Sequence, residues 1–126
     1  MRTIVEKITA HVDARGSVFE PLDAQGLAQQ RNVHIVTTAP GETRGNHRHL
    51  RGIEVATISG PALIRLREAG QLHELNIPDG ETWRLTIPAG VTHAYRNTGT
   101  GIMLIVGFNT EEHQPQHSDV ERDALF

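Results

Sequence analysis

The stretch RGNHRHLRGIE, residues 44–54, decides how this chain folds and what it can bind. Two histidines separated by one residue, His47 and His49, lie on one face of a β-strand, because strand side chains alternate with period two. Residues 50–53 are enough to turn the chain, so a neighbouring strand would return the carboxylate of Glu54 to the same place. The stretch therefore predicts two adjacent strands that bring two imidazoles and one carboxylate together.

A third imidazole comes from a second stretch, PAGVTHAYRN, residues 88–97. His93 lies far along the chain from Glu54, so the fold must bring it back to complete a site. Three neutral nitrogen donors and a carboxylate suit zinc, iron, manganese, nickel or copper, and the chain has no cysteine that would favour a thiolate site. We expect one divalent ion, with zinc first and iron, manganese or nickel as alternatives. A lone histidine is more often a surface or core residue, and only the combination of these positions predicts a metal site.

Both stretches resemble the two motifs of the cupin superfamily. In the first motif, G-x5-H-x-H-x3-4-E-x6-G, Gly41 and the ligands in residues 47–54 are in register, whereas Gly60 comes one residue early. The end of the second motif, P-x-G-x2-H-x3-N, matches residues 88–97 position for position, but its upstream glycine, Gly80, lies two residues too far away. The resemblance implies a double-stranded β-helix, or jelly-roll barrel, that holds the metal ligands.

The rest of the chain also predicts an all-β protein. Short alternating or β-branched runs recur with turn signals roughly every eight to twelve residues, and helical character is limited to one turn near residues 25–30. A chain of 126 residues has the length of one domain, so we expect a single cupin domain over 1–126, with an N-terminal strand in 1–10 and a C-terminal strap in 110–126. The expected strands cover residues 4–8, 11–20 (strand, turn, strand), 32–38, 45–49, 53–59, 62–67, 72–77, 83–87 and 102–108.

Composition and the two ends of the chain restrict the partners. The formal net charge is −3 and the arginines are dispersed, so neither nucleic acid nor an anionic membrane is expected to bind. Residues 1–7 lack the apolar run of a signal peptide, and no segment reaches membrane-spanning length, which predicts a cytoplasmic protein. The strand at residues 3–8 and the apolar end at 124–126 have no obvious place in one small barrel. Because edge strands need a partner, we expect a homodimer; disorder is the alternative for the strap.

A closer resemblance is carried by residues 13–20, 41–49, 59–67 and 87–93. These segments are similar to the C-terminal cupin domain of bifunctional capsular-polysaccharide UDP-sugar reductase/epimerases, over about residues 11–110. More distantly, the RGNHRH string resembles dTDP-4-dehydrorhamnose 3,5-epimerases and dTDP-keto-sugar isomerases. We expect the chain to depart from the bifunctional proteins in two ways: it would lack their N-terminal reductase domain, and FNTEE stands where they show a Trp-x-Asn-Glu pattern.

The resemblance implies epimerisation or isomerisation of a nucleotide-linked 4-keto-6-deoxy sugar. A metal ion suits this chemistry, because a Lewis acid stabilises the enolate that forms when a proton beside a ketone is removed. In the cofactor-free epimerases the histidine at the position of His47 is the base, but here the other ligands favour a role in metal binding. His34 is then the expected base and Tyr95, on the same strand face as His93, the expected acid. A satisfied histidine and a packed aromatic ring are the structural alternatives.

Arg44, Arg65 and Arg67 are candidates for holding the diphosphate of such a substrate, since a guanidinium forms forked hydrogen bonds to phosphate oxygens. Arginines that only protect an exposed sheet face are the alternative. Two other functions stay open: an Fe(II)-dependent cupin dioxygenase, and a non-catalytic sugar-binding module whose ion stabilises the barrel. An open coordination position would favour either enzyme over the binding module, because a structural ion is usually closed by protein ligands.

Overall fold

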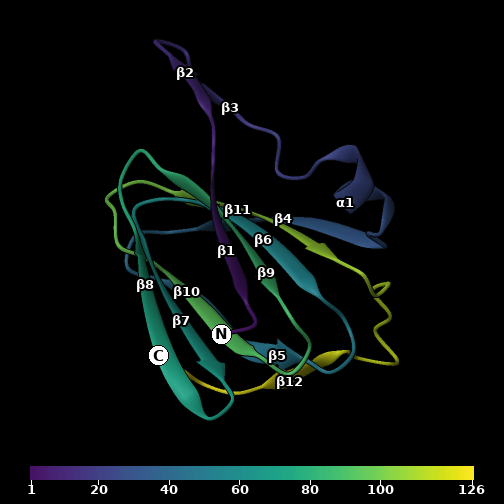
Figure 1. Cartoon of the computed structure of the whole chain (residues 1–126). Coiled ribbons are helices and arrows are strands. Elements are labelled where there is room, and N and C mark those ends of the chain that lie inside the picture. Colours follow the sequence, from purple (N-terminus) through teal and green to yellow (C-terminus); the bar gives the residue numbers. More distant parts are fainter.

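Two five-stranded sheets face one another in the computed structural model, which describes residues 1–126 (Figure 1). One sheet has the strand order β1-β9-β6-β11-β4 and the other β12-β5-β10-β7-β8. The all-β jelly-roll fold predicted from the sequence is confirmed, and β10 and β12 are the strands that the prediction missed. The elements are β1 (Ile4–Ile8), β2 (His11–Asp13), β3 (Gly16–Val18), α1 (Ala24–Ala28), β4 (Asn32–Thr38), β5 (Thr43–His49), β6 (Glu54–Ser59), β7 (Ala62–Glu68), β8 (Gln71–Ile77), β9 (Thr82–Ile87), β10 (Thr92–Asn97), β11 (Met103–Asn109) and β12 (Val120–Arg122).

The alternation of residue types in β7 shows how sequence sets the inner face of a sheet. Ala62, Ile64 and Leu66 are fully buried, whereas the residues between them are partly exposed on the outer side. Where β7 turns into β8, Ala69 and Gly70 have φ angles of 50° and 76°. Positive φ at both central residues is the geometry of a type I′ turn, which matches the twist of two antiparallel strands. The strands expected at 62–67 and 72–77 are therefore the two arms of a hairpin.

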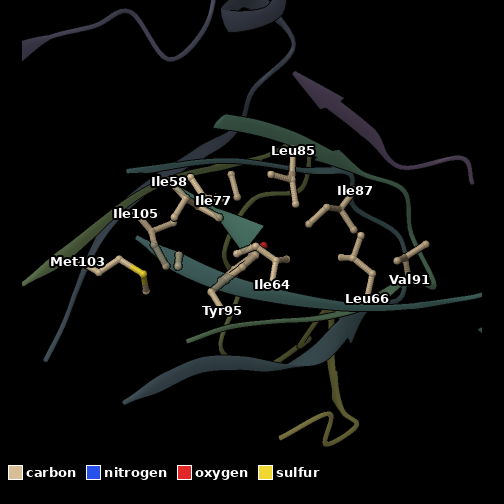
Figure 2. Close-up of a cluster of buried hydrophobic side chains, with 12 residues drawn as sticks. Ile58, Ile64, Leu66, Ile77, Leu85, Ile87, Val91, Tyr95, Met103 and Ile105 are labelled. Carbon is tan, nitrogen blue, oxygen red and sulfur yellow. The ribbon is translucent and has the colours of Figure 1, made fainter. Parts of the chain in front are cut away.

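Apolar side chains from both sheets meet between the layers and form the core (Figure 2). Ile58 of β6, Ile64 of β7 and Leu85 of β9 have no exposed surface. Burying an aliphatic side chain of this size stabilises a fold by about 1.5–3 kcal/mol. Tyr95 of β10 belongs to the same cluster, and its hydroxyl marks the point where the core gives way to polar residues.

The N-terminal segment joins the barrel through β1 and then leaves it. β1 is the outermost strand of its sheet and pairs with β9. The carboxylate of Glu68 holds its start, accepting from the backbone N–H of Arg2 at 2.6 Å and from the N–H and hydroxyl of Thr3 at 2.8 Å. The β2–β3 hairpin that follows extends away from the sheets, and its strand residues, Val12 and Val18 among them, are exposed (Figure 1).

One short helix, α1, lies where the sequence predicts a helical turn. Asp23 caps its N-terminus, because the Oδ1 atom accepts a hydrogen bond from the N–H of Gly26 at 2.7 Å. None of the helical structure in this protein has the length and apolar character that crossing a bilayer requires.

The C-terminal strap, residues 110–126, lies against the barrel of its own chain. Its strand β12 pairs with β5, the strand that carries the two ligand histidines. The side-chain oxygen of Asn46 accepts hydrogen bonds from the N–H groups of Leu125 and Phe126 at 2.8 and 3.2 Å, and Leu125 is buried. The expectation that this apolar end has no place in one barrel is thus corrected: β5 and the outer face of β7 provide that place. The other reason for expecting a homodimer, the position of β1 at the edge of its sheet, is unchanged by this finding.

Candidate metal centre

Four ligand candidates that are distant in sequence converge between the two sheets. His47 and His49 project from β5, Glu54 begins β6, and His93 lies on β10. One donor atom from each lies within 4.8 Å of the other three. Close strand approach is part of this geometry: a Cβ atom at Gly45 would lie 2.7 Å from the backbone oxygen of His93. The structure thus brings together all four residues that the motif spacing selects.

The tautomer of His93 leaves a lone pair pointing into the cluster. Its Nδ1 lies 3.0 Å from the backbone oxygen of Val91, which can only accept a hydrogen bond, so Nδ1 carries the proton. In the neutral ring Nε2 is then bare, yet it lies 2.9 Å from Oε2 of Glu54. The Nε2 atoms of His93 and His49 are both buried and lack a hydrogen-bond partner. The bare Nε2 atom of His93 would be satisfied by a cation held between it and the Glu54 carboxylate, so these residues fit a metal ion.

The charges of the cluster also suit a divalent cation. Burial raises the pKa of Glu54, but the nearby His93 and His49 outweigh it and hold this pKa well below its ordinary value, so the carboxylate is ionised. Burial and the neighbouring His93 lower the pKa of His47 to about 4, which keeps its ring neutral near pH 7. Burial lowers the pKa of His49, but Glu54 and Asp119 outweigh it and raise this pKa. An ionised carboxylate among imidazoles is the donor set of many transition-metal sites.

Three residues of the cluster, His47, His49 and Glu54, line a cavity of about 550 Å³, and the fourth, His93, is fully buried behind them. Only one of its 14 lining residues is hydrophobic. The titratable side chains on the wall are His34, His47, His49 and His113 together with Glu54, Glu111, Glu112 and Asp119. No lysine or arginine lines the cavity, so its wall is acidic wherever a bound cation does not compensate the carboxylates.

His34 lies on the wall of the same cavity, as its predicted role requires. It is an exposed residue of β4, directly opposite Gly107 of β11 in the strand pairing. The imidazole packs directly against the backbone of Gly107: a Cβ atom built there would lie 2.5 Å from Nε2 of His34. The glycine therefore makes room for the His34 ring beside the cavity.

Tyr95 and the three arginines lie elsewhere. Tyr95 is buried in the core and donates its hydroxyl proton to Oε2 of Glu54 at 2.7 Å; burial, and then the Glu54 carboxylate, raise its pKa well above the ordinary value. This position makes it a support for Glu54 and differs from the role of acid expected for it. Arg44 is exposed and donates to the backbone oxygen of Thr37 at 2.9 Å.

Arg65 and Arg67 are on the outer face of β7, where the strap covers them. Arg67 donates to Asp123 at 2.6 Å, and Arg65 donates to the backbone oxygen of Leu125 at 2.8 Å. The guanidinium of Arg65 also lies 4.2 Å from the ring centre of Phe126. The structure does not bring these two arginines to the cavity, because strand alternation turns them to the side opposite the buried Leu66 and Ile64.

Several residues of the cavity are not among the site residues predicted from the sequence. They are Asn32, Asn109, Glu111, Glu112, His113 and Asp119. The excess of histidines, eight in the chain, was the one hint, since His113 is a histidine outside the motifs. Most of the others lie in the strap, which has no periodicity from which their direction could be predicted.

Comparison with known proteins places the chain among polysaccharide-related sequences. The model of the family described as polysaccharide biosynthesis C-terminal domain matches residues 11–121. A search of curated proteins gave no match. The resemblance expected from the sequence is thus confirmed at the level of the family.

Solved structures with the same fold include sugar-modifying proteins. The capsular polysaccharide assembling protein CapF from Staphylococcus aureus is 26% identical with a TM-score of 0.70; the alignment covers 94% of this chain and 34% of that one. The chain thus spans about a third of CapF. A dTDP sugar isomerase from Desulfovibrio desulfuricans G20 is 18% identical with a TM-score of 0.78 and coverage of 98% and 84%. The 3,4-ketoisomerase QdtA from Thermoanaerobacterium thermosaccharolyticum, solved with TDP, is 21% identical with a TM-score of 0.69 and coverage of 96% and 88%.

Proposed function

The chain belongs to the polysaccharide biosynthesis C-terminal domain family, and from this premise we propose that it is a metal-binding epimerase or isomerase of a nucleotide-linked 4-keto-6-deoxy sugar. The single observation that carries the proposal is the donor cluster on the wall of a polar cavity of about 550 Å³. Structural neighbours described as a dTDP sugar isomerase and as a ketoisomerase bound to TDP support the substrate class.

His47, His49, Glu54 and His93 would hold the ion, with zinc as the first candidate. When bound, the ion would supply a Lewis acid for the ketone oxygen of the sugar, where negative charge develops as the proton on the neighbouring carbon is removed. Glu54 contributes the negative charge of the site, and Tyr95 keeps the carboxylate oriented by donating to Oε2. Four protein ligands would fill the tetrahedron that zinc adopts in structural sites, so the proposed reaction requires an ion that accepts the sugar oxygen as a fifth ligand or in place of one side chain.

His34 is the proposed base. It lines the same cavity as residues of the donor cluster. Because His34 is exposed, its imidazole can take a proton from the sugar and then pass that proton to water. Tyr95 is too deeply buried to reach the sugar, so we assign the return of a proton to solvent that enters the cavity. Water as the proton source predicts that the reacting carbon exchanges hydrogen with the solvent.

The acidic wall restricts how a nucleotide sugar could bind. Since no lysine or arginine lines the cavity, a diphosphate inside it would face the carboxylates of Glu111, Glu112 and Asp119. We therefore propose that the sugar enters the cavity while the diphosphate and the nucleoside remain outside it. Arg44, which is exposed, is the one predicted arginine that the strap does not cover.

A homodimer is part of the same proposal. The β2–β3 hairpin extends from the barrel with Val12 and Val18 exposed, and β1 leaves one sheet edge free. A two-stranded hairpin is at best marginally stable in water unless something packs on it. A second copy of the chain would cover these surfaces.

Hydrogen exchange tests the proposed reaction. In deuterium oxide the zinc-loaded protein should introduce deuterium at C3 or C5 of a UDP- or dTDP-linked 4-keto-6-deoxy sugar. His34→Asn should slow this exchange and leave the metal content intact, whereas His73→Asn, on β8 and outside the cavity, should leave both unchanged.

Exchange no faster than in the absence of protein, for either nucleotide and with the metal site filled, would overturn the proposal. Oxygen consumption under the same conditions would point to a dioxygenase instead. Binding of the sugar without either reaction would indicate a sugar-binding module.

A further inference from the structure

Asp119 of the strap connects the segment that lines the cavity to the turn between two metal ligands. Its Oδ1 accepts from the N–H of Arg51 at 2.8 Å, and its Oδ2 accepts from the N–H of Gly52 at 3.0 Å. Its backbone oxygen accepts from the N–H of Leu50 at 2.7 Å. These bonds hold three of the four residues in the turn that joins His49 of β5 to Glu54 of β6.

The same carboxylate also reaches the ring of His49. Oδ2 of Asp119 lies 3.4 Å from Nδ1, on the far side of the ring from Nε2, which lies 3.4 Å from Oε1 of Glu54. The side chains of Asp119 and His49 are only 12% and 11% exposed, so water screens this contact weakly. His49 therefore lies between two carboxylates, one in the donor cluster and one outside it.

Asn109 competes with Asp119 for the same ring nitrogen. Its Oδ1 accepts from the N–H of Glu111 at 2.7 Å, which fixes the amide so that Nδ2 lies 3.3 Å from Nδ1 of His49. An amide N–H can only donate, so Nδ1 must accept from it; the ring proton is then on Nε2, which blocks metal binding. A carboxylate can only accept, so Nδ1 must carry the proton; the lone pair of Nε2 is then free for a metal ion.

We propose that Asp119 is a positioning residue that selects the metal-binding tautomer of His49, with Nδ1–H directed to its carboxylate and the Nε2 lone pair directed to the donor cluster. This inference rests on the proposed metal site. The charged acceptor prevails over the neutral amide because hydrogen bonds to ionised groups are about twice as strong. Partners of this kind outside the ligand set orient the ligands of many metal sites.

The turn itself is shaped to admit both competitors. A Cβ atom at Gly52 would lie 2.1 Å from Oδ1 of Asn109 and 2.9 Å from Oδ2 of Asp119. Any other residue there would push both side chains away from His49. Because Asp119 also lines the cavity, the strap that meets the substrate is the segment that prepares one of the metal ligands.

Two measurements test the role of Asp119. In metal-free protein with ¹⁵N-labelled histidine, at a pH high enough to leave His49 neutral, the nitrogen chemical shifts report the tautomer directly. Wild type should show Nδ1–H at His49, and Asp119→Asn should shift the population to Nε2–H. Competition with a chromophoric chelator should show zinc affinity reduced about 10–100-fold in Asp119→Asn, and Asp119→Glu should recover part of it.

The control is Asp123→Asn, which changes another strap carboxylate, bound to Thr92 and Arg67 but not to His49. It should lower the melting temperature comparably and leave the tautomer and zinc affinity unchanged. Nε2–H in metal-free wild type, an unchanged tautomer in Asp119→Asn, or equal losses of zinc affinity in both variants would overturn the inference. A wild-type protein that shows the expected tautomer but binds no zinc would instead contradict the proposed function.

Discussion

Residues outside the ligand pattern hold two of the candidate ligands, His93 and Glu54, in place. The backbone oxygen of Val91 fixes the His93 ring, and the hydroxyl of Tyr95 holds Glu54. Because these partners are themselves buried, the site is organised by the core before an ion binds.

Tyr95→Phe tests this support. The change keeps the packed ring and removes the O–H that donates to the ionised, buried Glu54 at 2.7 Å. We expect the free energy of unfolding of the metal-free protein to fall by about 1–3 kcal/mol, measured by urea denaturation. Ser59→Ala, which removes a contact between neutral hydroxyls at 3.2 Å, should cost less. An equal or smaller loss in Tyr95→Phe would contradict the support of Glu54 by Tyr95.

The neutral ring of His47 predicts a dependence of stability on pH. Its folded-state pKa of about 4 lies below the ordinary value of 6.5, so between these values the unfolded chain binds a proton that the folded protein does not. Metal-free wild type should therefore lose stability as the pH falls from 6.5 toward 4, and this residue should contribute nothing above 6.5. In His47→Gln the loss over this window should be smaller, as denaturant titrations at several pH values would show. Parallel curves for the two proteins would refute the prediction.

The pairing of β4 with β11 places the proposed base. β4 is the outermost strand of its sheet, and only its register with β11 sets His34 opposite Gly107 beside the cavity. An element at a sheet edge thus brings a side chain to a site whose ligands come from β5, β6 and β10.

Gly107→Ala should move the His34 ring without disturbing the metal ligands. The new methyl group would lie 2.5 Å from Nε2 of His34, closer than any van der Waals contact allows. We expect solvent exchange into the substrate to slow by up to about 100-fold, the cost of misplacing a reacting group by about 1 Å, with zinc content unchanged. Gly101→Ala, where a Cβ atom meets nothing within 4 Å, is the matched control. Equal exchange rates in both variants would exclude His34 as the base in this position.

Over the whole molecule, the hydrophobic core and the polar donor cluster occupy separate regions. The hydrophobic core fills the space between the sheets (Figure 2). The donor cluster lies at the end of that core, where the hydroxyl of Tyr95 donates to Glu54. The strap packs on the outer face of the sheet that contains β5 and β7. The β2–β3 hairpin instead extends away from the barrel, and its residues are exposed. The edge of β1 and the β2–β3 hairpin are the surfaces that we propose for a second copy.

Val12→Asp tests the homodimer. We expect light scattering at micromolar concentration to give twice the mass of 13.9 kDa for wild type and a larger monomer fraction for the variant, because a charge on the hairpin opposes burial there. The same charge at Thr100, in the exposed loop between β10 and β11, should have no effect. A wild-type protein that is monomeric under these conditions would rule out the dimer.

The sequence alone determined the strand faces and selected the candidate ligands, because both follow from the spacing of residues within short motifs. Period-two alternation puts His47 and His49 on one side of β5 whatever surrounds them, and the β7–β8 turn follows from its own residues. The same rule could have assigned Arg65 and Arg67 to the outer face, since they alternate with the buried residues of β7.

Only the tertiary structure decided which distant side chains meet. Asp119 approaches His49, and Tyr95 donates to Glu54, because strand register and the path of the strap set those separations. Such distances result from the packing of two whole sheets, to which many weak contacts contribute, and no single segment contains that information. Local chemistry thus fixed what each strand presents, and the packing of the sheets fixed which residues each ligand touches.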